Sequence, residues 1–218
     1  LSPVDQSAPP ELSMRLLDAV QHALLLASAG QQRDLLAEQC LACTVSREEC
    51  LEIAGAKAGS LLSLACRLGA ICADVGEVRI EQCAELGRLL GIAAQLDNDA
   101  HDLSHLLQPS DGQKSDLKRG KKTLPVVLAA HSLCEMRGLS AVEVDEALLS
   151  LTFCAPEEQK IAVSALREGI MTTWGISLLY RERARDCLHE IGEGKPLSPS
   201  LHQVLGLDRL ITQQFEPV

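Results

Sequence analysis

An acidic group of residues ends an otherwise apolar helical segment, where Gln95 is followed by Asn98, Asp99 and Asp102. Spacings of three and four residues place such side chains on one face of a helix. Carboxylates that lie close together repel each other unless a cation lies between them. Mg²⁺ prefers oxygen ligands and commonly binds together with phosphate groups, so this helix end predicts a Mg²⁺–diphosphate site. A solvated polar helix end is the alternative interpretation.

A basic segment follows in a chain that is acidic overall, with a formal net charge of −10 at pH 7. Its cationic side chains are Lys114, Lys118, Arg119, Lys121 and Lys122. Ammonium and guanidinium groups can neutralise phosphate oxygens that a metal ion leaves uncovered. The acidic helix end and the basic segment together therefore favour a metal-bridged polyanion, while a solubilising charged loop is the alternative.

Two further features lie earlier in the chain. Lys57 stands among small residues in the stretch Gly55–Gly59, so its side chain either extends to solvent or points into a cavity. Gly30 lies inside a helical pattern, where a glycine costs about 1 kcal/mol relative to alanine, and we expect a packing or functional reason for it. Gln31 and Asp34 follow at a spacing of three residues and share a helical face.

The elements that must position these residues are helices. Leu and Ala, both strong helix formers, dominate the 218 residues, and no stretch shows the alternation of a strand. We therefore predict an all-α fold in a single domain, residues 1–218. Ser46 and the stretch Thr123–Pro125 indicate helix starts. The expected helices cover about residues 12–43, 47–73, 78–107, 125–137, 140–151, 156–168, 169–192 and 198–212.

Charge and composition narrow the function classes. An acidic chain with a pI of about 5.1 lacks the basic surface that a general nucleic-acid partner requires. No apolar segment has the length of a membrane span and no signal peptide is visible, so we expect a soluble cytoplasmic protein. The nine unclustered cysteines are typical of reduced thiols. Because the sequence begins at Leu1 and not at Met, we expect N-terminal helices to lie outside it.

Four short motifs occur in a fixed order: Gly30-Gln-x-x-Asp-Leu35, Lys57-Ala-Gly59, Gln95-x-x-Asn98-Asp99-x-x-Asp102 and Asp116-Leu-x-x-Gly-Lys121-x-Thr-Leu-Pro125. They resemble the motifs GQxxDL, KTG, FQxxDDxxD and DxxxGKxTLP of the trans-isoprenyl diphosphate synthases, also called polyprenyl synthetases. The resemblance extends from about residue 14 to residue 137. Each motif alone is weak, but four in the family order identify the chain as a divergent member.

The resemblance implies an isoprenoid synthase-type helical bundle around a central cavity, assembled as a homodimer. It also implies a prenyltransferase reaction between an allylic prenyl diphosphate and isopentenyl diphosphate. In that reaction Mg²⁺ assists the ionisation of the allylic diphosphate. The double bond of isopentenyl diphosphate then attacks the allylic cation, and a proton is lost.

Residue roles carried over from the family motifs fall into three groups. The metal ligands would be Asn98, Asp99 and Asp102. The catalytic residues would be Lys57, Gln95 and Lys121, of which the two lysines contact the allylic diphosphate. The substrate-binding residues would be these three together with Gln31 and Asp34, which line the reaction cavity.

Several positions depart from the family pattern. Asn98 replaces an aspartate, and because an amide offers one neutral oxygen we expect weaker Mg²⁺ binding. Ala58 replaces the threonine of KTG, and Ala94 replaces the phenylalanine of FQ. The first aspartate-rich motif of the family is absent and would lie before Leu1.

These departures leave three functions open. The chain could belong to a chain-elongating prenyl diphosphate synthase. It could also come from a divergent relative that cyclises terpenes or prenylates another acceptor. The third alternative is a non-catalytic subunit of a heteromeric synthase.

Overall fold

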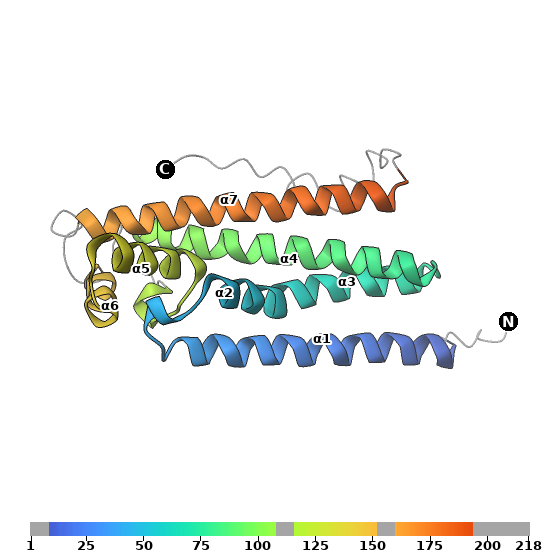
Figure 1. The fold of residues 1–218 in the computed structure, drawn as a ribbon. Coiled ribbons are helices and arrows are strands. Elements are labelled where there is room, and N and C mark those ends of the chain that lie inside the picture. Colours follow the sequence, from blue (N-terminus) through green and yellow to red (C-terminus); the bar gives the residue numbers. More distant parts are fainter. Residues whose placement is uncertain (1–8, 108–115, 152–159, 194–218) are drawn as a thin grey trace.

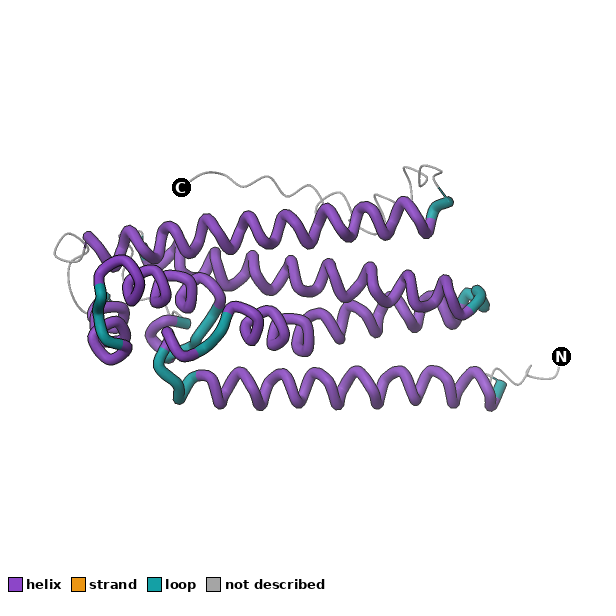
Figure 2. Tube along the Cα trace, in the orientation of Figure 1, coloured by secondary structure: helices purple, strands orange, loops and turns teal. Residues whose placement is uncertain are grey.

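The computed structural model describes residues 9–107, 116–151 and 160–193, and every regular element in these ranges is helical (Figure 1, Figure 2). The all-α prediction is therefore confirmed. The α-helices are α1 (Pro10–Ala37), α2 (Arg47–Ala54), α3 (Ser60–Cys72), α4 (Glu77–Leu106), α5 (Leu124–Arg137), α6 (Ala141–Ser150) and α7 (Lys160–Ile191). Two 3₁₀ turns, η1 (Ala42–Thr44) and η3 (Leu117–Arg119), and a π-helical turn, η2 (Gly55–Gly59), complete the described elements.

The long helices lie side by side (Figure 1). Helix α3 packs against α1 on one side and α4 on the other, and α7 packs against α4. Because α2, η2 and α3 follow each other without a break, the single helix predicted over about 47–73 is confirmed, with a π turn inside it. The short helices α5 and α6 gather at the end of the bundle where α1 ends and α2 begins.

Local sequence signals fix several helix starts as predicted. The hydroxyl of Ser46 accepts a hydrogen bond from the Glu49 N–H at 3.0 Å, so α2 begins at Arg47. Helix α5 begins at Leu124 with Pro125 in its first turn, where the missing N–H costs nothing. Ser140 starts α6 through a complete capping box with Glu143.

Two predicted boundaries are wrong. The helix expected over 12–43 ends at Ala37, because the chain then turns and the Ala42 N–H donates to Asp145 Oδ1 at 2.8 Å. The helices expected over 156–168 and 169–192 form one continuous helix in the described range, α7. Gly169 does not break that helix but allows a close approach, since an added Cβ would lie 2.3 Å from the carbonyl oxygen of Pro125.

Glycines also set the spacing between α3 and α4. A Cβ on Gly87 would lie 2.3 Å from the Leu62 carbonyl oxygen, and one on Gly91 would lie 2.5 Å from that of Ala58. Only a residue without a side chain permits this backbone-to-backbone contact. The contact at Gly91 brings the π turn directly against α4.

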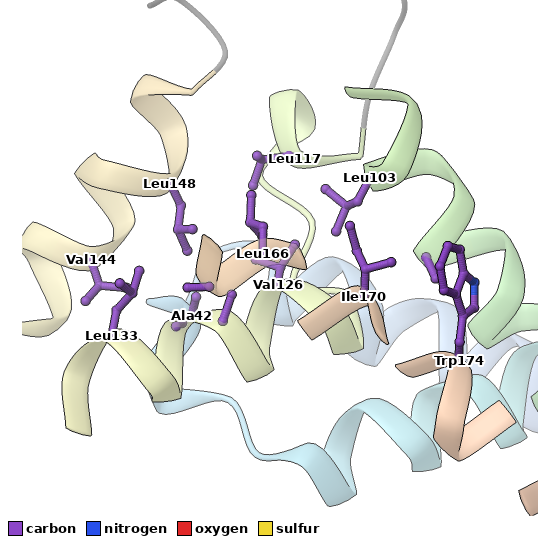
Figure 3. Packing of buried hydrophobic residues seen from close by; sticks show 14 residues of the cluster. Ala42, Leu103, Leu117, Val126, Leu133, Val144, Leu148, Leu166, Ile170 and Trp174 are labelled. Carbon is purple, nitrogen blue, oxygen red and sulfur yellow. The ribbon is translucent and has the colours of Figure 1, made fainter. Parts of the chain in front are cut away.

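A cluster of buried apolar side chains lies where α4, α5, α6 and α7 meet (Figure 3). It includes Leu103, Leu117, Val126, Leu133, Val144, Leu148, Leu166, Ile170 and Trp174. Because the cluster joins the end of α4 to η3 and α5, it holds the acidic helix end beside the basic segment.

Several predicted features lie outside the described residues: the helix over 198–212, the first residues of the helix over 156–168, and the side chains of Lys114 and Lys118. Within the described ranges, no helix is long and apolar enough to cross a membrane.

Candidate functional site

Lys57 lies in the π-helical turn η2, where the Ser60 N–H donates to the Gly55 carbonyl oxygen, five residues earlier. Such turns are rare and frequently occur at functional sites. The Lys57 ammonium forms an ion pair with the Asp34 carboxylate of α1, and both side chains are largely buried. Gly30 permits this pairing, because a Cβ there would lie 2.7 Å from the Ala56 Cβ. The glycine inside α1 therefore has a packing reason, as expected.

Asp99 faces the same region from α4. The side-chain amide of Gln95 donates to Asp99 Oδ1 at 2.9 Å, one turn away on the same helix. The pKa of the Asp99 carboxyl is raised to about 7, mainly by burial and also by the charges of Asp116 and Asp34, while Gln95 and Lys121 act to lower it. The positive charge near Asp99 therefore does not offset the cost of burying its carboxylate.

The basic segment reaches the site through a tight turn after Asp116. Gly120 adopts the left-handed conformation at φ 76°, which favours glycine, and the Lys121 N–H donates back to the Asp116 carbonyl oxygen at 3.0 Å. The Lys121 ammonium then lies 2.9 Å from Asp116 Oδ1. The Asp116 N–H in turn donates to Asp102 Oδ2 at 2.8 Å, which ties the turn to the end of α4.

These elements enclose a small cavity of about 30 Å³. Five of the eight predicted site residues line it: Asp34, Lys57, Gln95, Asp99 and Lys121. The cavity is the size of a water molecule, so a diphosphate can enter only if the lining lysines move away from their carboxylate partners. The sequence motifs, although up to 87 positions apart between Asp34 and Lys121, therefore meet at one place.

Three predicted residues lie next to this cavity and do not line it. Gln31 is exposed on α1, one turn before Asp34, and Asn98 is exposed on the flank of α4. Asp102 is half-buried and accepts the Asp116 N–H. The roles assigned to these three residues stay predictions.

Thr123 and Lys122 also line the cavity. The sequence indicated Lys122 only as one cation of the basic segment, and it did not indicate Thr123 as a site residue. The Thr123 hydroxyl oxygen is buried, and no residue in the described ranges forms a hydrogen bond with it. Lys122 is held by Asp145 of α6, with 3.3 Å between Nζ and Oδ2. Thr123 belongs to the motif that ends at Pro125, so its place in that motif was an available signal; the partner of Lys122 could come only from the tertiary structure.

Comparison with known proteins identifies the family. The family model described as polyprenyl synthetase matches residues 6–145. The chain belongs to the polyprenyl synthetase family. It is 33% identical over 189 residues to a geranylfarnesyl diphosphate synthase of Aeropyrum pernix, covering 83% of this chain and 55% of that protein. It is 31% identical over 127 residues to a short chain isoprenyl diphosphate synthase of Methanocaldococcus jannaschii, covering 56% of this chain and 37% of that one.

Solved structures show the same polyprenyl synthetase fold. A decaprenyl diphosphate synthase from Rhodobacter capsulatus matches with a TM-score of 0.71 at 20% identity, over 93% of this chain and 61% of that one. A polyprenyl synthetase from Streptomyces coelicolor A3(2) matches with a TM-score of 0.67 at 25% identity, over 92% and 57%. The chain thus spans only about half the length of these polyprenyl synthetases and the relatives above.

The site residues fit the Mg²⁺ that this family implies. Three ammonium groups and two carboxylates line the cavity, and Lys57, Lys121 and Lys122 are each paired with an aspartate. This leaves Asp99 as the lining carboxylate that has no ion pair among the described residues. Among the residues that the structure describes, no three His, Cys, Asp or Glu side chains are placed to hold a metal by themselves. Mg²⁺ commonly needs only one or two carboxylates when phosphate oxygens and water complete its shell, so the buried, undercompensated Asp99 suits a metal bound together with diphosphate.

A larger cavity of about 340 Å³ lies between α1 and α3. Its wall begins at Leu26 and Ser60, one helical turn past Lys57, and extends to Arg15 and Glu77. These two charged side chains pair with each other at 3.1 Å. A further lining residue, Arg67, pairs with Glu81, and none of the eight predicted site residues lines this cavity.

Proposed function

We propose that the chain forms the diphosphate-binding half of a trans-isoprenyl diphosphate synthase, a prenyltransferase that joins an allylic prenyl diphosphate to isopentenyl diphosphate. The observation that carries this proposal is the convergence of Lys57, Gln95, Asp99 and Lys121 on one cavity inside the residues matched to the family. The names of the relatives, which are prenyl diphosphate synthases, support the same class of reaction.

In this proposal the ammonium groups of Lys57 and Lys121 bind oxygens of the allylic diphosphate. Each lysine exchanges its present carboxylate partner, Asp34 or Asp116, for a phosphate oxygen. When the carbon–oxygen bond breaks, the diphosphate leaves with the bonding electrons and gains negative charge, which the two fixed cations stabilise. The double bond of isopentenyl diphosphate then forms the new carbon–carbon bond, and a proton is lost.

Asp99 and Asp102 would hold Mg²⁺, with the amide oxygen of Asn98 as a neutral third ligand. Bound Mg²⁺ supplies Lewis acidity toward the oxygens of the leaving diphosphate. Gln95 keeps the Asp99 carboxylate in a fixed orientation through its hydrogen bond to Oδ1. The buried hydroxyl of Thr123 is a further group that can donate to a phosphate oxygen.

Gln31 and Asp34 complete the proposed substrate-binding set. Asp34 lines the cavity, and Gln31 lies one turn along α1 at its edge. The homodimer and the cytoplasmic location stay predictions. No specific feature of the described residues favours terpene cyclisation, another prenyl acceptor or a non-catalytic subunit.

Calorimetric titration of the 218-residue chain with pyrophosphate tests the binding part of this proposal. We expect saturable binding that requires Mg²⁺, and at least a tenfold loss of affinity in Asp99→Asn, because that variant removes a metal-binding charge without changing shape. Equal pyrophosphate affinity with and without Mg²⁺, or equal affinity in the variant, would contradict it. Incubation with isopentenyl diphosphate and allylic diphosphates, followed by product analysis, then separates elongation from the alternatives.

A further inference from the structure

A buried ion pair lies behind the candidate site. The guanidinium of Arg181 on α7 contacts Asp97 Oδ2 on α4, and the two residues are only 1% and 4% exposed. One turn away along both helices, the Ser177 hydroxyl donates to the Ala93 carbonyl oxygen at 3.1 Å. Two polar contacts thus connect α7 to the back of α4.

Asp97 lies on the side of α4 opposite to the cavity. Successive residues of an α-helix are separated by about 100°, so Asp97 is about 200° away from both Gln95 and Asp99. Gln95 and Asp99 line the cavity, whereas Asp97 faces α7. The rotation of α4 about its axis therefore decides which of the two aspartates, Asp97 or Asp99, faces the proposed diphosphate site.

Packing against the neighbouring helices already favours this rotation, because Gly91 contacts the Ala58 backbone and Leu96 and Leu103 are buried on one side of α4. Asp97 adds a stricter condition, because its carboxylate can be buried only where a cation meets it. Within the described part of the chain, Asp97 Oδ1 has no hydrogen-bond partner, so the burial of this carboxylate depends on its ion pair with Arg181.

We propose that the Asp97–Arg181 ion pair is a positioning device, which fixes the rotation of α4 so that Gln95 and Asp99 face the cavity. Buried ion pairs are weak sources of stability, because apolar residues of similar volume often replace them without loss; their best supported role is to specify one arrangement. The inference rests on the proposed function, since it assigns Asp97 and Arg181 a role in building that same site.

The test compares stability with binding in the double variant Asp97→Leu/Arg181→Met. A pair that serves only stability predicts unchanged pyrophosphate affinity in any folded variant. The positioning role predicts a melting temperature equal to or above that of the wild type, with Mg²⁺-dependent pyrophosphate affinity at least tenfold lower. The conservative double variant Asp97→Glu/Arg181→Lys keeps an ion pair and should recover most of the affinity. Pyrophosphate affinity within twofold of the wild type in the apolar variant overturns the proposal.

A second readout does not need a ligand, so it separates failure of this inference from failure of the proposed function. A cysteine at position 98, introduced as Asn98→Cys, stands at an exposed position on α4. Its rate of maleimide labelling, measured by peptide mass spectrometry against the exposed Cys72 as internal standard, reports the rotation of α4. We expect at least a fivefold change in that rate when the apolar pair replaces Asp97 and Arg181. An unchanged rate overturns the inference, whether or not the wild type binds pyrophosphate.

Discussion

At the residue scale, Asp99 is the position where ligand binding and stability oppose each other. Its pKa is raised from 3.8 to about 7, mainly by burial, so the folded protein holds this proton more tightly than the unfolded chain. Stability from a raised pKa is present at low pH and is lost as the pH rises from about 4 to about 7. At pH 8, without Mg²⁺, the Asp99 carboxylate therefore destabilises the fold.

Asp99→Asn should remove the destabilisation that the Asp99 carboxylate causes at pH 8. We expect the free energy of unfolding at pH 8 to exceed that of the wild type by roughly 1 to 4 kcal/mol, with the difference vanishing near pH 4. Urea unfolding at both pH values in the presence of a chelator measures it. A variant that is equally destabilised at both pH values would show that Asp99 acts through its hydrogen bond with Gln95 and not through its charge.

Alanine variants of Lys121 and Arg119 test how the basic segment contributes to pyrophosphate binding: through the position of one lysine or through its summed charge. Lys121 lines the cavity and its side chain is 24% exposed, whereas the Arg119 side chain is 58% exposed. Lys121→Ala should weaken Mg²⁺-dependent pyrophosphate binding by about 10- to 100-fold, because it removes a hydrogen bond to a charged group. Arg119→Ala, the matched control, should change it by about twofold or less. Equal losses in titration calorimetry would mean that only the summed charge matters.

At the element scale, the contact between the π turn η2 and α4 brings Lys57 and Asp99 to the same cavity. Gly91→Ala should cost about 1 to 3 kcal/mol of folding free energy, because its Cβ would lie 2.5 Å from the backbone oxygen of Ala58. Gly69→Ala is the control: it lies inside α3 with nothing within 4 Å of an added Cβ, and it should stabilise by up to about 1 kcal/mol. Urea unfolding of the two variants measures both changes in the free energy of unfolding. Changes of the same sign in the two variants would contradict the close backbone contact at Gly91.

At the scale of the whole molecule, α1 exposes apolar side chains on the face turned away from α3. Met14, Leu17, Leu24, Leu25, Leu35 and Leu36 are all more than half exposed. Exposed apolar side chains such as these are more stable when another surface covers them. In a purified sample a second copy of the chain offers such a surface, so we expect concentration-dependent self-association.

Leu24→Glu combined with Leu25→Glu should shift the sedimentation-velocity distribution toward monomer. Burying a charged residue in an apolar interface is unfavourable, which is the reason for the shift. Met171→Glu on α7, a position 60% exposed and away from α1, serves as the control and should leave the distribution unchanged. A monomeric wild type at high concentration would contradict the expectation.

The sequence by itself determined the helical class, most helix starts and five of the residues around the cavity. Helix starts depend on local contacts such as Ser46 with Glu49, which span three residues and need no distant partner. Likewise, the spacing of Gln95 and Asp99 already places both on one face of α4. The ordered motifs then indicated the family that the matched residues 6–145 confirm.

Only the tertiary structure decided the rotation and the pairing of these elements. Asp97 and Arg181 are 84 positions apart, and no periodicity reveals that they neutralise each other behind the site. The predicted boundary between residues 168 and 169 is wrong, and local propensity cannot show that Gly169 lies against Pro125 of another helix. The pKa of Asp99 depends on its burial and on charges from distant segments, such as Asp34 and Lys121. Only the packed molecule brings these groups together, which is the physical reason why the sequence could not reveal the raised pKa.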